Sequence, residues 1–110
     1  MKPETAKAAG KNDAERFISR ELIDYEPFVA LSDMHLVRKT VPVSFDALHT
    51  TVAQLDGDLW QTIAGSVNEL VQKHGDSFSP DRYAEGLVEG VAAVWEKIRA
   101  EVLKQPSSDI

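Results

Sequence analysis

The central part of the chain carries apolar side chains at helical spacing. After Ser44 they follow one another at steps of three and four residues: Phe45, Leu48, Val52, Leu55, Leu59, Ile63, Val67 and Leu70. This spacing places them on one face of an α-helix. Ser44 is a suitable N-cap, and Gly75 is a suitable C-terminal cap behind the cations Lys73 and His74. The pattern therefore predicts a long central helix over residues 44–74.

The segment Asp56-Gly57-Asp58 interrupts this helix near its middle. Glycine and aspartate are weak helix formers, and Asp58 with Gln61 can open a new helix as a capping box. The apolar stripe nevertheless keeps its direction across Gly57 to within roughly 60°, counted at about 100° per residue, which a reversing loop has no reason to preserve. We therefore predict a helix that is kinked near Gly57 with little reversal, and a full break is the alternative.

A second long helix is expected at the C-terminus. Ser79 can cap it, Pro80 suits its first position and Asp81 suits the positive end of its dipole. Its buried stripe comprises Tyr83, Leu87, Val91, Val94, Trp95, Ile98 and Val102. The connection over residues 75–78 is short, so the central and C-terminal helices are expected to be antiparallel neighbours.

The first part of the chain is less regular. Asn12 and Glu15 form a capping box that predicts the start of a first helix, and Pro27 ends this helix or begins a short second one. Farther on, four apolar residues have β-like spacing: Val37, Val41, Val43 and Phe45. No second strand is available to pair with them, so we expect an extended arm that packs on its own helices or reaches a neighbour. Helix and strand remain the alternatives for residues 28–43.

These elements define one domain of the all-α class, as the length of 110 residues suggests. Residues 1–11 and 105–110 have few large apolar side chains and are expected to be disordered tails. Residues 12–104 then form a small bundle of three to four helices. In this bundle the long central helix, kinked near Gly57, runs antiparallel to the C-terminal helix, and the extended arm precedes it.

Charge and composition narrow the possible functions. The net charge is −6, from 18 acidic and 12 basic residues, so the chain repels the phosphate backbone of nucleic acids. No apolar run approaches the ~20 residues that a membrane span requires, and no signal-peptide pattern is present. The absence of cysteine excludes disulfides and thiolate zinc sites, and it fits a reducing cytoplasm. We expect a cytoplasmic protein that binds neither nucleic acid nor membrane.

The sequence offers no recognisable catalytic or metal-binding motif. The Asp-Gly-Asp segment lacks the spacing and the closing glutamate of a calcium loop. The histidines at positions 35, 49 and 74 have no partner histidine at the spacing of a zinc-binding helix. We therefore expect no cofactor, no metal, no catalytic residue and no enzymatic activity. An enzyme would have to use His35, His49 and Asp56.

The central stripe instead indicates a partner. A straight helix over residues 44–74 would be ~45 Å long at about 1.5 Å per residue, which overhangs a compact domain with a radius of gyration near ~12 Å. The overhanging apolar face would need a second copy of the chain or another protein to cover it. Trp60 lies at the edge of this stripe and is a typical interface anchor. The expected partner-binding residues are Phe45, His49, Val52, Asp56, Leu59, Trp60 and Ile63.

A second feature concerns small residues on the C-terminal helix. Gly86, Gly90 and Ala93 form a track beside its main stripe. Such a track permits close approach of another helix, either within the subunit or from another chain.

These features predict a small, acidic, non-enzymatic protein–protein interaction module. Its most specific form is a regulator that masks the surface of a larger protein, as an antiactivator masks a transcription factor. The partner would be that protein, a second copy in a homodimer, or both. A secretion or assembly chaperone and an immunity-type protein are the alternatives, followed by a small metal- or His/Asp-dependent enzyme.

Overall fold

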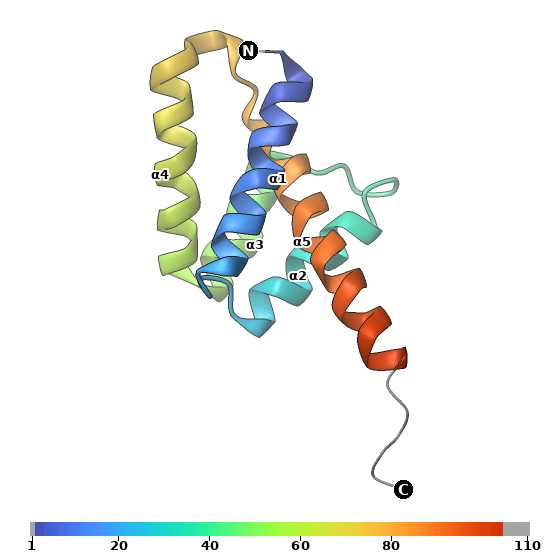
Figure 1. The fold of residues 1–110 in the computed structure, drawn as a ribbon. Helices are drawn as coiled ribbons and strands as arrows, with labels where there is room; N and C mark the ends of the chain where they lie inside the picture. Colours follow the sequence, from blue (N-terminus) through green and yellow to red (C-terminus); the bar gives the residue numbers. More distant parts are fainter. Residues whose placement is uncertain (1, 105–110) are drawn as a thin grey trace, which may run out of the picture.

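The computed structural model of the protein describes residues 2–104 and consists of α-helices. These are α1 (Pro3–Ser19), α2 (Tyr25–Leu36), α3 (Phe45–Leu55), α4 (Gly57–His74) and α5 (Pro80–Lys104), with the 3-10 turn η1 (Gly75–Ser77) between the last two (Figure 1). Within residues 2–104 there is no β-strand. The predicted all-α class is therefore confirmed.

Helix α5 is the central element of the fold. It packs most extensively on α1, then on α2, and its first turns also contact α3. Figure 1 shows α1 crossing α5, and in both views the C-terminal half of α5 projects beyond the other helices. The core between the helices is formed mainly by Phe17, Leu31, Leu48, Val52, Leu59, Ile63, Tyr83, Leu87, Val88 and Val91.

The N-terminal boundary of α1 differs from the prediction. The helix begins at Pro3 instead of Asn12, with proline in its first turn and Glu4 near the positive end of its dipole. The signal was missed because this half of α1 packs through small residues, and both Ala6 and Gly10 are buried. Residues 3–11, expected as a disordered tail, are thus helical. The tail expected at residues 105–110 lies outside the described residues.

Close packing of α1 on α5 depends on glycine. A Cβ atom built on Gly86 would lie 1.9 Å from the carbonyl oxygen of Lys7, and one on Gly90 would lie 2.8 Å from the Cβ atom of Ala14. Because these distances are shorter than any real contact, only glycine permits this approach of the two helices. Two members of the small-residue track therefore serve packing within the subunit. The third, Ala93, is exposed.

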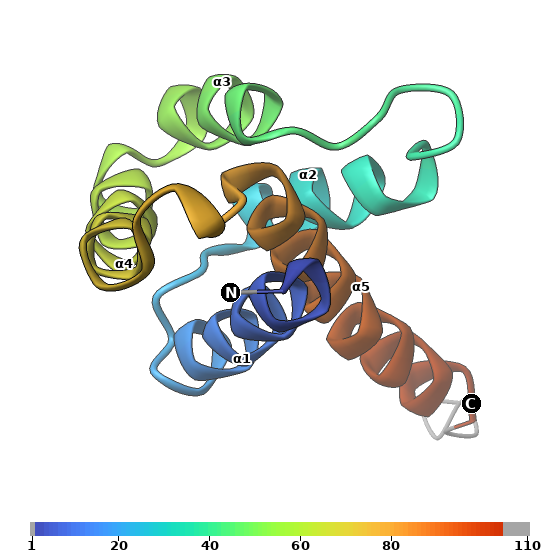
Figure 2. The same cartoon turned by 90° about the horizontal axis from the view of Figure 1, so that it is seen from above.

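The predicted long central helix is wrong. Helix α3 ends at Leu55, and Asp56 adopts an extended conformation, with φ −157° and ψ 96°. The Asp56 carboxylate accepts a hydrogen bond from the Leu59 N–H at 3.1 Å, so Asp56 is the N-cap of α4. Figure 2 shows α3 lying across the view while α4 is seen end-on. The chain breaks at Asp56, and no kinked helix forms near Gly57.

Two further details of the arrangement also differ. The central and C-terminal helices were expected to be antiparallel neighbours, whereas α5 packs mainly on α1 and α2. Of the alternatives left open for residues 28–43, residues 28–36 are helical within α2, and the segment expected as an extended arm begins with a turn over Val37–Val41. In this turn the Val41 N–H donates to the Val37 carbonyl oxygen at 2.8 Å, and Val43 afterwards enters the core.

Candidate functional site

A groove follows the contact between α2 and α5 and is closed at one end by α1. It consists of two adjoining cavities of about 270 Å³ and 260 Å³, which share His35, Arg38 and Glu89 in their walls. We call the two together the α2–α5 groove. The first cavity is its polar half and the second is its apolar half.

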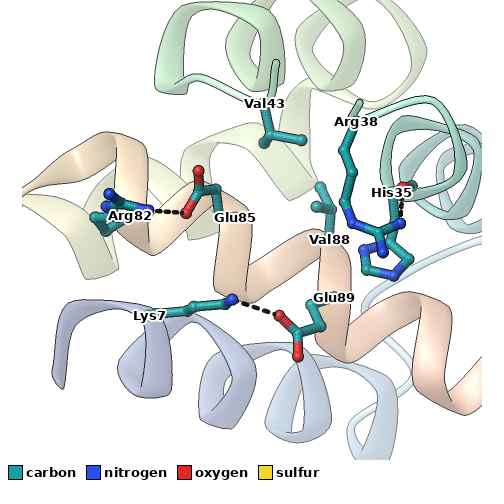
Figure 3. A pocket seen from close by; sticks show the side chains of 8 residues that line it. All are labelled: Lys7, His35, Arg38, Val43, Arg82, Glu85, Val88 and Glu89. Atoms are coloured by element: carbon teal, nitrogen blue, oxygen red, sulfur yellow. Dashed lines mark hydrogen bonds and ion pairs between the residues drawn. The ribbon is translucent and has the colours of Figure 1, made fainter. Parts of the chain in front are cut away.

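The polar half brings charged side chains together from three parts of the chain (Figure 3). Lys7 comes from α1, Arg38 from the turn after α2, and Glu85 and Glu89 from α5. The Lys7 Nζ atom lies 3.0 Å from the Glu89 Oε2 atom. Arg82, which also belongs to α5, lies with its Nη1 atom 2.9 Å from the Glu85 Oε2 atom. Both carboxylates of this half are thus already paired with cations.

Arg38 is the cation of the polar half that has no carboxylate. Its Nη1 atom donates a hydrogen bond to the carbonyl oxygen of His35 at 2.6 Å. No carboxylate of the described residues lies within ion-pair distance of its guanidinium. The hydrogen bond orients the side chain, and the remaining N–H groups of the planar fork stay available to a ligand.

The charges around this half shift two pKa values. Partial burial, followed by the charge of Arg38, lowers the pKa of His35 from its ordinary value, although Glu89 acts in the opposite direction. The imidazole is therefore neutral near neutral pH. The hydrogen bond from Lys7 lowers the pKa of Glu89, with Lys11 contributing at 3.3 Å against the effect of burial. Glu89 therefore remains ionised in its ion pairs.

The apolar half continues along α5 toward its C-terminal end. Its apolar wall is formed by Leu36, Ala92, Ala93 and Trp95, and Glu96 and Arg99 lie at its edge. The Trp95 ring is fixed by an edge-to-face contact with Phe28, with ring centroids 5.6 Å apart.

Three large apolar side chains at the end of α2 and in the turn that follows it face solvent. Leu36, Val37 and Val41 are 63%, 48% and 57% exposed. Leu36 itself lines the apolar half, and the hydrogen bond between the Val41 N–H and the Val37 carbonyl keeps the other two one turn apart. We call these three residues the apolar rim.

The residues predicted from the sequence as partner-binding lie elsewhere, at the corner between α3 and α4. Val52, Leu59 and Ile63 are buried in the core, so they cannot contact a partner while the protein is folded. Asp56 is a helix cap. The break at Asp56 lets both helices turn most of this face inward, so the stripe no longer requires a companion to cover it, although Leu55 remains 43% exposed.

Only the aromatic members of the predicted set share a surface. The His49 ring stacks on the Trp60 ring at a centroid distance of 4.4 Å, and Phe45 lies against Trp60 at 5.3 Å. Phe45 and Trp60 are half-buried against the core, and His49 is exposed. This aromatic corner is a packed junction between α3 and α4.

A buried polar cluster was not found from the sequence. One carboxylate oxygen of Asp13 accepts hydrogen bonds from Ser66 Oγ and from the Tyr83 hydroxyl, each at 2.5 Å. The other oxygen lies 2.8 Å from Arg16. Burial, reinforced by the hydrogen bond to Asp13, raises the pKa of the Tyr83 hydroxyl far above its ordinary value. The cluster joins α1, α4 and α5, and its short separations are visible only in three dimensions.

The groove residues were missed for the same reason. The sequence shows Arg38 and Lys39 as a small basic patch, but Lys7, His35 and Glu89 meet Arg38 only after folding. Among the described residues, no group of three or more histidine, aspartate or glutamate side chains is placed to hold a metal ion. In the same part of the chain, every helix is too short or too polar to cross a membrane.

Comparisons with protein-family models, with curated proteins and with solved structures found no match.

Proposed function

We propose that this protein is a protein–protein interaction module that binds a segment of a larger protein at the α2–α5 groove and the apolar rim. In this role it is a regulator that masks the partner's surface, as an antiactivator masks a transcription factor. A secretion or assembly chaperone, or an immunity-type protein, would use the same kind of surface, and the identity of the partner distinguishes them.

The observation that carries this proposal is the apolar rim. Leu36, Val37 and Val41 expose 48% to 63% of their surface, and Leu36 lines the apolar half of the groove. Single exposed apolar residues are common on soluble proteins, but several in one short segment that leads into a groove are typical of an interaction site.

The openness of the groove also favours a protein partner. Small-molecule sites have volumes of roughly 300–1,000 Å³ and enclose most of the ligand. The two halves, at about 270 Å³ and 260 Å³, reach this range only together, and both are open to solvent. Each half has room for one or two side chains of a partner, with the exposed rim adding contact area around them.

The proposal is tested by placing a charge in the rim. Leu36→Asp should abolish recovery of the partner in affinity capture from lysate of the source cells, because a buried unpaired carboxylate in an interface costs several kcal/mol, on the order of 100-fold or more in affinity. Circular dichroism should show unchanged helicity, since the replaced side chain is exposed.

Val71→Asp is the matched control. Val71 is a similarly exposed aliphatic residue, at 39%, but it lies on α4 and outside the groove. This variant should recover the same partner as the native protein. Equal recovery by both variants, or no protein that the native chain recovers and the Leu36 variant loses, would contradict the proposal.

A further inference from the structure

We infer that the α2–α5 groove takes an acidic segment of the partner protein, with a carboxylate bound at Arg38 and an adjacent apolar side chain between Leu36 and Trp95. This inference rests on the proposed function and adds the chemistry of the bound segment.

The charge distribution of the polar half supports a carboxylate. Lys7 and Lys11 both lie against Glu89, and Arg82 lies against Glu85. Among the residues that line this half, Lys7 and Arg82 balance Glu89 and Glu85, so Arg38 gives it a net positive charge, although the whole chain has a net charge of −6. An acidic segment is repelled by most of this surface and attracted to this place, which favours one binding position over others.

The geometry of Arg38 supplies the specific contact. Its hydrogen bond to the His35 carbonyl fixes the side chain at the wall shared by both halves of the groove. A guanidinium held in this way can donate two parallel hydrogen bonds to one carboxylate, which is stronger than a contact with a mobile side chain. Figure 3 shows the guanidinium beside the His35 ring and on the side of Val88.

The number of unpaired charges in this half favours a single negative charge. A carboxylate matches the one cation that has no carboxylate, Arg38, whereas the second charge of a phosphate would find Lys7 and Arg82 already paired with Glu89 and Glu85. A basic segment would face Arg38 and find both carboxylates already paired. Glu96 and Arg99 border the apolar half with opposite charges, so this half has less net attraction for a carboxylate than the Arg38 end.

The apolar half accounts for the second part of the segment, which is the apolar side chain next to the carboxylate. Leu36, Ala93 and Trp95 form a wall there that offers contact area and few hydrogen-bond partners. A leucine or aromatic side chain next to the acidic residue would cover this wall and exclude water from it. Because Arg38 lies in the wall of both halves, one short segment can make both contacts.

His35 provides an independent signal for binding. The charged groups that face it are Arg38, Lys7, Glu89 and Glu96, and Arg38 contributes to lowering its pKa. A carboxylate bound at Arg38 would offset this effect and raise the pKa of His35. By linkage, the segment should bind more tightly as the pH falls through the pKa of His35.

The test is selection of a random-peptide library on the immobilised full chain. Enriched peptides should carry aspartate or glutamate beside leucine, isoleucine or an aromatic residue. For an enriched peptide, Arg38→Gln and replacement of the peptide's acid by its amide should each weaken binding about tenfold in titration calorimetry, since about 1.4 kcal/mol corresponds to tenfold. NMR of the His35 ring should show the raised pKa in the complex.

Lys39→Gln is the control, because it removes the same charge from the same turn without touching the groove. It should leave the affinity for the peptide unchanged.

Four results would overturn the inference. They are enrichment of basic peptides, no enrichment at all, equal losses of affinity in the Arg38 and Lys39 variants, and displacement of the peptide by inorganic phosphate at a lower concentration than by acetate. If peptide binding depends on Leu36 but not on Arg38, this inference is wrong and the proposed function stands. If the Leu36→Asp variant still recovers the cellular partner, the proposed function is wrong.

Discussion

At the residue scale, the most constrained side chain is Asp13. Its carboxylate is nearly buried and receives hydrogen bonds from Ser66 and Tyr83, while its second oxygen meets Arg16. A buried carboxylate is tolerated only when its oxygens are satisfied, and these three partners satisfy both of them. Because Ser66 lies on α4 and Tyr83 on α5, a single residue of α1 positions two other helices.

We expect Asp13→Ala to cost more than Tyr83→Phe. The alanine variant leaves the buried Tyr83 hydroxyl without an acceptor, at a cost of about 2–3 kcal/mol in the free energy of unfolding. The phenylalanine variant leaves Asp13 with Ser66 and Arg16, so about 1 kcal/mol is lost. Urea unfolding followed by circular dichroism measures both.

Arg16→Ala serves as the comparison for this pair. Its guanidinium is half-exposed, so solvent screens the ion pair and the loss should stay below about 1 kcal/mol. If Asp13→Ala destabilised the protein no more than Arg16→Ala, the cluster would not hold the three helices together.

At the element scale, the glycines of α5 and α4 have opposite roles. Gly86 faces the backbone of α1, where a Cβ atom would lie 1.9 Å from a carbonyl oxygen of Lys7. Gly65 is also inside a helix, but a Cβ atom there would meet nothing within 4 Å. Replacing glycine by alanine at each of these two positions therefore measures two different effects, the cost of overpacking at Gly86 and the gain in helix propensity at Gly65.

Gly86→Ala should destabilise the protein by about 2 kcal/mol or more, because α1 must move away from α5. Gly65→Ala should stabilise it by roughly 0.5–1 kcal/mol, since alanine loses less backbone entropy in a helix. Thermal unfolding of the two variants under identical conditions gives both values. A stable Gly86→Ala variant would show that the two helices are not in the close contact described.

The elements also show where sequence patterns were sufficient. The helix at Pro80 was predicted because its cap, proline and acidic residue are consecutive in the chain, and the structure begins α5 there. The break at Asp56 was missed because both helices direct their apolar faces to one core, so the stripe keeps its phase through the break. The start of α1 was missed because glycine and alanine contacts with α5 leave no apolar pattern.

At the scale of the whole molecule, the fold could be predicted from the sequence much better than the site. Helical periodicity identified most of the core, including the buried faces of α3, α4 and α5. The groove could not be identified in this way, because Lys7, Arg38 and Glu89 come from three distant segments that folding brings together. Periodicity reports which residues turn inward, whereas a site on the surface depends on which helices become neighbours.

Burial of most of the central stripe also bears on the oligomeric state of the isolated chain. The apolar rim at Leu36, Val37 and Val41 is small, and the other exposed large apolar side chains, such as Tyr25, Leu55, Val71 and Ile98, lie on other segments of the chain, whereas a stable homodimer needs roughly 800 Å² from each partner. Two copies with a net charge of −6 each also repel one another. We therefore expect light scattering after size exclusion to give the mass of a single chain at micromolar concentrations, in low and in high salt. A dimer that persists in the native chain and dissociates in Leu36→Asp would instead identify a second copy as the occupant of the rim.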